Sequence, residues 1–275
     1  MPFSAKRTVS SFALALAAGC ASAPPLPADA LAFGLLGDTP YNDAEIARLE
    51  HVIDAMNAAD LRFVAHVGDI GSARNACSDE WLAARKAQFA RIRHPFVLLP
   101  GDNEWTDCRD QLGRLAAWRR FFCFQEKLPV ERQPGEYCEH LRWRAGGFIF
   151  VTLNVQGSNN NVVHPEEHGP RMNVVYAWLD EAARRAENQR GLVVLMQADP
   201  FIVLPRDGYV GLRERLAALG KQMPGRVILV HGDTHVFRDD EPIPGVRRIE
   251  VWGSPFVRWL EGAIGESGLS VRQGP

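Results

Sequence analysis

Residues 227–235 read VILVHGDTH, an apolar run that stops at a polar turn with a glycine and an aspartate. The run Val227–Val230 predicts a buried strand, and the glycine that follows permits a tight turn. Four other segments show the same pattern, an apolar run that ends at an aspartate-containing motif: LAFGLLGDTP (31–40), FVAHVGDI (63–70), FVLLPGDNE (96–104) and LVVLMQADP (192–200). Strands of this kind, separated along the chain, predict an α/β fold with a mainly parallel sheet.

Helical periodicity fills the intervals between these strands. The predicted helices are Asp43–Ala59, Glu80–Ile92, Leu112–Phe122, Val174–Glu187 and Leu212–Leu219. A further strand is expected over Gly147–Val155, and the alternation in Val236–Val271 predicts additional antiparallel strands. Two long polar loops are expected over Glu126–Arg144 and Gln156–Arg171, and long loops in a compact domain are often functional.

The acidic residues at the strand ends are the candidate functional residues. In an open α/β sheet the carboxyl ends of the strands line the ligand crevice, so these side chains are expected to converge. They are Asp38, Asp69, Asp102, Asp199 and Asp233, with His235 beside the last. Each acid alone would be an ordinary turn residue or helix cap, and Asp199 before a proline is the weakest of them. Their repetition at five strand ends favours a shared site.

Clustered carboxylates repel one another unless a cation neutralises them. The pattern therefore predicts one or two divalent metal ions. Oxygen-rich ligation favours Mn²⁺, Mg²⁺ or Ca²⁺, with iron or zinc also open.

The order of these motifs resembles that of the calcineurin-like metallophosphoesterases. That family carries Asp-x-His, Gly-Asp, Gly-Asn-His-Asp/Glu, a lone histidine and Gly-His-x-His, each after a strand. The matching segments are Gly37-Asp38-Thr39-Pro40, Gly68-Asp69, Gly101-Asp102-Asn103-Glu104, Gln197-Ala198-Asp199-Pro200 and Gly232-Asp233-Thr234-His235. The resemblance implies a single domain with four αββα layers, in which helices flank a two-sheet sandwich. It also implies hydrolysis of a phosphoester by a metal-activated hydroxide.

Several positions depart from the family pattern, mostly from nitrogen to oxygen ligands. Pro40 stands in place of the first histidine, and Asn103 replaces the histidine that usually protonates the leaving group. Asp102 replaces the ligand asparagine. Gln197 or Asp199 replaces the lone histidine, and Asp233 the first histidine of the last motif.

The resemblance implies roles for the remaining residues. Asp69 would bridge two ions, with Asp38 and His235 on one. Asp102, Asp233 and either Asp199 or Gln197 would hold the other. Asn103 would donate a hydrogen bond to a phosphoryl oxygen. The proton for the leaving group is expected from Glu104, His66 or His231, although histidines at positions such as 66 and 231 are more often structural.

The alternative function is a non-catalytic protein that binds a metal or ligand on a degenerate phosphoesterase scaffold.

The first 30 residues have the character of an export leader. Lys6 and Arg7 precede the apolar stretch Ser11–Gly19, which is too short to span a bilayer. Cys20 ends a lipobox-like sequence and could carry lipid, or cleavage could follow Ala28-Asp29-Ala30. The mature domain is then expected over residues 31–275, in the periplasm or as a membrane-anchored lipoprotein.

Cysteine usage agrees with export. Besides Cys20 there are four cysteines, for which we favour the pairs Cys77–Cys108 and Cys123–Cys138 over free thiols.

Charge and hydropathy limit the expected partners. The net charge is −2, and no basic cluster indicates a nucleic-acid partner. No apolar run is long enough for a transmembrane helix. The expected partner is a small-molecule phosphoester, and no protein partner is evident.

Overall fold

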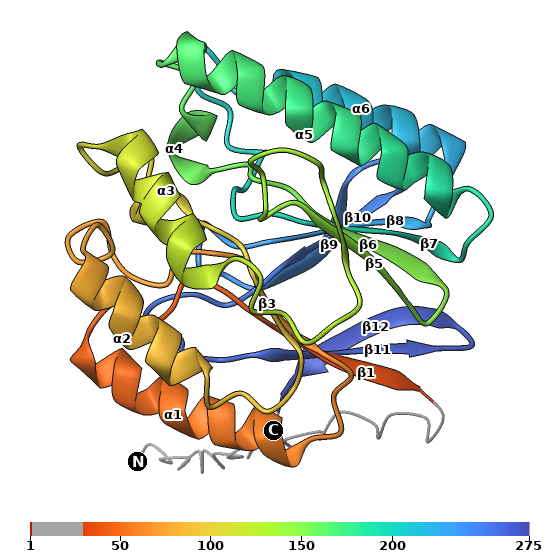
Figure 1. Cartoon of the computed structure of the whole chain (residues 1–275). Coiled ribbons are helices and arrows are strands. Elements are labelled where there is room, and N and C mark those ends of the chain that lie inside the picture. The colour runs from red at the N-terminus through yellow and green to blue at the C-terminus, as the bar shows by residue number, and fades with distance from the viewer. Residues whose placement is uncertain (2–29, 275) are drawn as a thin grey trace.

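Two β-sheets face each other, with helices on the outer side of each (Figure 1). The computed structural model describes Met1 and residues 30–274. The leader predicted over residues 1–30 therefore lies almost wholly outside the described residues, as does Cys20.

The first sheet has five strands in the order β12-β11-β1-β2-β3. Their bounds are β1 Leu31–Leu36, β2 Val64–His66, β3 Phe96–Leu98, β11 Leu260–Gly265 and β12 Gly268–Gln273. Strands β1, β2 and β3 are parallel, whereas β11 runs antiparallel to β1 and β12 antiparallel to β11.

The second sheet has seven strands in the order β4-β5-β6-β7-β8-β10-β9. Their bounds are β4 Glu131–Arg132, β5 Leu141–Ala145, β6 Phe148–Thr152, β7 Gly191–Leu195, β8 Val227–His231, β9 Arg238–Ile243 and β10 Val246–Glu250. The central strands β6, β7, β8 and β10 are parallel, and the outer pairs are antiparallel.

The helices form the two outer layers. They are α1 Asp43–Ala58, α2 Asp79–Phe89, α3 Gln111–Phe122, α4 Gly157–Asn160, α5 Pro165–Ala186 and α6 Val210–Gln222, with a 3₁₀ turn, η1, at Asp102–Glu104. Residues of α1, α2 and α3 pack on one face of the five-stranded sheet, and residues of α5 and α6 on one face of the other. The four-layer αββα arrangement is thereby confirmed.

Each sheet packs against one hydrophobic core on each of its two faces. In β1, Phe33 and Leu35 point into the core between the sheets, whereas Leu36 packs against the helices. In β6, Phe150 faces the core between the sheets and Val151 faces the helical side. Because successive side chains alternate between faces, a strand covered on both sides is apolar throughout, which is why these runs are so easy to find in the sequence.

Most predicted elements occur within three residues of their expected bounds, with two exceptions. Helix α5 begins at Pro165, not at Val174, so much of the expected loop Gln156–Arg171 is helical. Pro170 inside α5 obscured the helical pattern, because proline normally interrupts a helix. The expected loop Glu126–Arg144 contains the short strand β4 and most of β5.

The structure contains both disulfides that the sequence analysis favoured. Cys77 pairs with Cys108, and Cys123 pairs with Cys138, with Cα atoms 5.7 and 5.8 Å apart. In the part of the chain that the structure describes, no helix is long and apolar enough to cross a membrane.

Candidate metal centre

The loops after β1, β2, β3, β7 and β8 meet at the carboxyl edge of the two sheets. The main chain N–H of Asp233 donates to Asp38 Oδ1 at 3.0 Å, which joins the loop after β8 to the loop after β1. The main chain N–H of Asn103 donates to Asp69 Oδ1 at 3.2 Å, which joins the loops after β3 and β2. The predicted convergence is therefore present for Asp38, Asp69, Asp102 and Asp233, which we call the four-aspartate cluster.

Glycine is required where these loops approach most closely. A Cβ atom on Gly232 would lie 1.9 Å from Asp38 Oδ2, and one on Gly101 would lie 1.8 Å from Asp69 Oδ1. No real side chain tolerates such contacts, so the glycines let each acid lie against the backbone of the neighbouring loop.

The four-aspartate cluster lacks counter-charge. Burial raises the pKa of Asp38, Asp69 and Asp102 above its ordinary value, and neighbouring acids raise it further. The pKa of Asp233 rises to about 7, mainly because of burial and then because of Asp102. Among residues 30–274 no lysine or arginine forms an ion pair with these four acids, and the buried Asp38 Oδ2 has no hydrogen-bond partner. Such a donor set fits a divalent cation.

His235 faces this cluster with its Nε2 atom. Its Nδ1–H donates to the carbonyl of Ser254 at 2.7 Å, which leaves the Nε2 lone pair 3.9 Å from Asp38 Oδ1. Histidines that bind metal are commonly oriented by this kind of hydrogen bond from the other ring nitrogen.

Tyr41 is the residue that sequence reasoning missed. Its hydroxyl donates to Asp69 Oδ2 at 3.0 Å and lies 3.3 Å from His235 Nε2. Burial raises the pKa of Tyr41, and the negative charge of Asp69 adds to this effect. Pro40 stands at the family's histidine position, and the next residue supplies a phenolic oxygen to the same cluster. The sequence Asp38-Thr-Pro-Tyr41 contained this clue, a hydroxyl one residue beyond the missing histidine.

Two side-chain amides present nitrogen to Asp69. Asn103 Nδ2 donates to Asp69 Oδ2 at 3.0 Å, and Gln197 Nε2 lies 3.3 Å from the same oxygen. Gln197 Oε1 accepts the main chain N–H of Gly157 at 2.6 Å, so its oxygen faces away from Asp69. In this orientation Gln197 is a hydrogen-bond donor to the site and not the oxygen ligand that we expected.

A left-handed turn supports Asp102. Ser158 to Asn161 are four successive non-glycine residues with φ between 46° and 58°, a strained conformation. The hydroxyl of Ser158 donates to Asp102 Oδ2 at 2.8 Å. Arg171 stabilises the turn, because this residue is 1% exposed and its guanidinium donates to Asn160 Oδ1 at 2.8 Å.

Two of the expected proton donors lie in supporting positions. Glu104 accepts the main chain N–H groups of Gly101, Asp69 and Ile70 at 2.6, 3.1 and 2.7 Å, and burial raises its pKa to about 8. His66 is buried, with Nε2 3.0 Å from the carbonyl of Thr39, and its pKa falls to about 4 because of desolvation. Glu104 therefore links the turn that carries Asp102 to the turn that carries Asp69, and His66 contacts the turn that carries Asp38.

The structure corrects the expected placement of Asp199 and His231. The main chain N–H of Asp199 donates to Asp233 Oδ2 at 2.8 Å, but its carboxylate faces His231 and Glu250. We call Asp199, His231 and Glu250 the Asp199 cluster. Glu250 is the last residue of β10 and was not predicted, because it lies within a strand and not in the polar turn that follows one.

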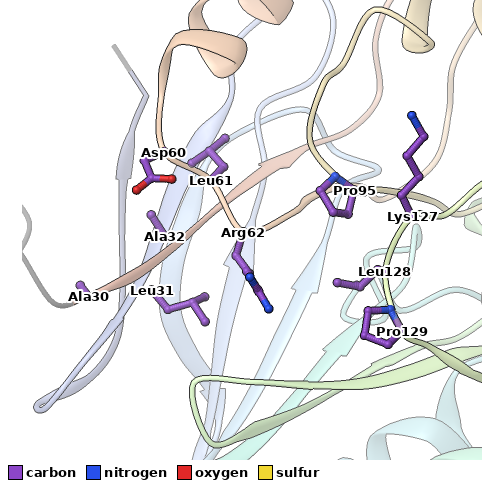
Figure 2. Close-up of a pocket in the computed structure, with 10 residues that line it drawn as sticks. All are labelled: Ala30, Leu31, Ala32, Asp60, Leu61, Arg62, Pro95, Lys127, Leu128 and Pro129. Atoms are coloured by element: carbon purple, nitrogen blue, oxygen red, sulfur yellow. The ribbon is translucent and has the colours of Figure 1, made fainter.

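The cavity of about 500 Å³ shown in Figure 2 lies at the other ends of these strands. Its lining residues come from the start of β1, the segment before β2, Pro95 and residues 127–129. Asp60 is the one carboxylate in this lining. The cavity therefore offers no metal-type donor set, and the four-aspartate cluster remains the candidate site.

Comparison with known proteins shows which solved structures share this fold. No family model matches the sequence, and no curated protein matches it. Among solved structures, a dimetal phosphatase from Danio rerio superposes with a TM-score of 0.61 at 13% identity, covering 88% of this chain and 95% of the other. The fold is that of the calcineurin-like metallophosphoesterases. A purple acid phosphatase from yellow lupin seeds gives a TM-score of 0.57 at 13% identity, and the match spans 89% of this chain but 52% of the lupin protein.

Proposed function

We propose that the protein hydrolyses a phosphoester with divalent metal bound at the four-aspartate cluster. The observation that carries the proposal is the convergence of four uncompensated acids, the Tyr41 hydroxyl and the His235 imidazole at one edge of the sandwich. The likeness to dimetal and purple acid phosphatases supports the proposal at the level of the fold.

Two sets of ligands fit this arrangement. Asp38, Tyr41 and His235 would hold one ion, and Asp102 and Asp233 a second, with Asp69 shared between them. Bound divalent ions supply Lewis acidity and lower the pKa of water. Asn103 and Gln197 would donate hydrogen bonds to phosphoryl oxygens from the side of Asp69, where negative charge develops.

The absence of an imidazole at position 103 has a consequence for substrate preference. An amide nitrogen positions an oxygen but cannot transfer a proton to a leaving group. Turnover is therefore expected to depend steeply on the acidity of the leaving alcohol, with aryl phosphoesters cleaved far faster than alkyl ones. Equal rates for nitrophenyl and alkyl esters would show that another group delivers the proton.

The direct test is to purify the chain with Mn²⁺ or Mg²⁺, measure bound metal, and assay generic phosphomonoesters and phosphodiesters. Asp69→Asn removes one shared negative charge at nearly constant shape and is expected to remove both metal and turnover. Asp60→Asn, on an exposed acid far from the cluster, is the matched control and should change neither. Turnover that persists in Asp69→Asn would contradict the proposal.

A second candidate function is binding without catalysis. The observation that favours it is the loss of two family histidines, with Asn103 in place of one and Gln197 or Asp199 in place of the other. A protein of this kind would bind metal in the same experiment and lose it in Asp69→Asn, but would show no turnover of any ester.

We also propose that the protein is exported, as its first 30 residues and its cysteines suggest. The disulfides Cys77–Cys108 and Cys123–Cys138 support this, because disulfides persist in oxidising compartments. Cell fractionation and labelling with a radioactive fatty acid test export and lipid attachment separately. Label that persists in Cys20→Ser would exclude attachment at that residue.

A further inference from the structure

The Asp199 cluster lies beside the candidate metal centre but faces away from it. One carboxylate oxygen each from Asp199 and Glu250 and one ring nitrogen of His231 lie within 4.8 Å of one another. All three residues are buried, and His231 is fully inaccessible. They come from the loop after β7 and the ends of β8 and β10, so the cluster joins three neighbouring strands.

His231 has one ring nitrogen without a hydrogen-bond partner. Its Nδ1–H donates to the carbonyl of Gly232 at 2.8 Å, and its buried Nε2 has no hydrogen-bond partner among residues 30–274. This is the arrangement found at His235, where Nδ1–H donates to the Ser254 carbonyl and Nε2 faces acids. A buried acceptor without a donor is costly, so a bound water or ion is expected to contact it.

The spacing favours an ion over a direct hydrogen bond. No hydrogen bond joins Nε2 to either carboxylate, because such bonds need about 3.5 Å or less. An ion bound at about 2.0–2.2 Å from each ligand joins atoms up to roughly 4.4 Å apart, and the ligand atoms of this cluster all lie within 4.8 Å of one another.

The local charge also permits a cation. Arg238 pairs with Glu250, and Arg248 pairs with Asp240 at 2.6 Å while lying 3.7 Å from Asp199 Oδ2. Arg238 and Arg248 therefore face the three carboxylates of Asp199, Asp240 and Glu250. One negative charge of this group is left without a positive partner.

We propose that Asp199, His231 and Glu250 form a further metal site, distinct from the four-aspartate cluster, for an ion such as Zn²⁺ that accepts mixed imidazole and carboxylate ligands. The ion would stabilise the loop that carries Asp233. Glu250 accepts the main chain N–H of Thr234 at 3.1 Å, and the main chain N–H of Asp199 holds Asp233 Oδ2. The site is structural in this proposal and takes no part in a chemical step.

Crystals of the full chain soaked with ZnCl₂ test the proposal through anomalous diffraction. The expected result is an anomalous peak between His231 Nε2, Asp199 and Glu250, separate from any peak at the four-aspartate cluster. A peak without anomalous signal, which would be an ordinary water bridging the same atoms, overturns the proposal, and so does the absence of any peak. Because the two positions are read independently, failure here is distinguishable from failure of the proposed function.

Metal analysis in solution gives the second measurement. His231→Gln is expected to lower the bound zinc by one ion per chain, whereas the exposed His164→Ala is the matched control and should leave the zinc content unchanged. In Asp69→Asn the ion at the Asp199 cluster should remain. Equal zinc content in His231→Gln and in the unaltered protein would overturn the proposal.

Discussion

Two carboxylate clusters lie side by side at the carboxyl edge of the sandwich, and they differ in how their charge is balanced. The Asp199 cluster has Arg238 and Arg248 beside it. The four-aspartate cluster has no arginine or lysine partner among residues 30–274, although it holds more acids. Each cluster also holds one histidine whose Nδ1–H is fixed by a main chain carbonyl.

The difference shows which acids depend on an external cation. A carboxylate paired with arginine is stable without metal, whereas crowded acids without counter-charge must bind protons or metal ions. The stability of the four-aspartate cluster should therefore depend strongly on metal and pH, whereas that of the Asp199 cluster, whose acids are partly balanced by arginines, should depend on metal less.

The largest effect is expected from Asp38→Asn. Turnover should fall by at least about 10³-fold, because a ligand is lost from a site that acts as a unit. The metal-free variant should at the same time be more stable than the metal-free parent, since one buried repulsive charge is gone. Steady-state kinetics and thermal unfolding in EDTA measure the two effects.

Asp239→Asn is the control for this pair of measurements. Asp239 is an acid that Arg247 already neutralises at 2.7 Å, outside both clusters. If Asp38→Asn destabilised the metal-free protein, as loss of one partner of an ion pair does, the four acids would not repel one another. The proposed difference in charge balance between the two clusters would then be wrong.

The fold was largely predictable because both faces of its central strands are covered. Strand β1 occurs over the predicted residues Leu31–Leu36, since an apolar run between two cores leaves little ambiguity. Edge strands were harder to predict: β4 has two residues and an exposed, charged sequence that resembles a loop.

The candidate site was predictable only as far as sheet topology determines it. Topology brings Asp38, Asp69 and Asp233 to one edge, and the glycine before each predicted a tight approach. Topology does not determine the direction of a side chain within a turn, so the sequence did not predict that the Asp199 carboxylate lies beside His231 and Glu250. Tyr41 was missed for a related reason, because ligand assignment followed the family's position at Pro40 and not the residue after it.

The second prediction concerns pH. In the metal-free protein the pKa of Asp233 is about 7, against about 3.9 in an unfolded chain. The folded state then binds protons more tightly, so the free energy of unfolding falls as pH rises from 4 to 7, by on the order of 3 kcal/mol. Saturating Mn²⁺ replaces the proton and should remove this fall. Chemical denaturation at pH 5 and 7.5, in EDTA and in Mn²⁺, provides the measurement, and identical pH profiles with and without metal would contradict it.

The third prediction concerns Tyr41→Phe. Loss of the hydroxyl beside Asp69 and His235 is expected to weaken metal binding by about 10–100-fold, the range typical of groups that support a metal site. Isothermal titration with Mn²⁺ measures the change. Tyr176→Phe, on a half-buried tyrosine of α5 outside both clusters, is the control. Unchanged affinity in Tyr41→Phe would remove the tyrosine from the ligand set.

The smallest effect is expected from Arg238→Gln, which tests the Asp199 cluster, where arginines balance acidic charge. The arginine side chain is 35% exposed, so removing its pairing with Glu250 should lower the free energy of unfolding by only about 1 kcal/mol in the absence of metal. The same change removes a positive charge next to Asp199, so Zn²⁺ should bind the Asp199 cluster more tightly and compensate for the loss. Arg144→Gln, at an exposed arginine of β5, controls for the charge change itself. Zinc that stabilised the parent and Arg238→Gln equally would mean that arginine and metal do not compete there, and the two clusters would then differ in geometry alone.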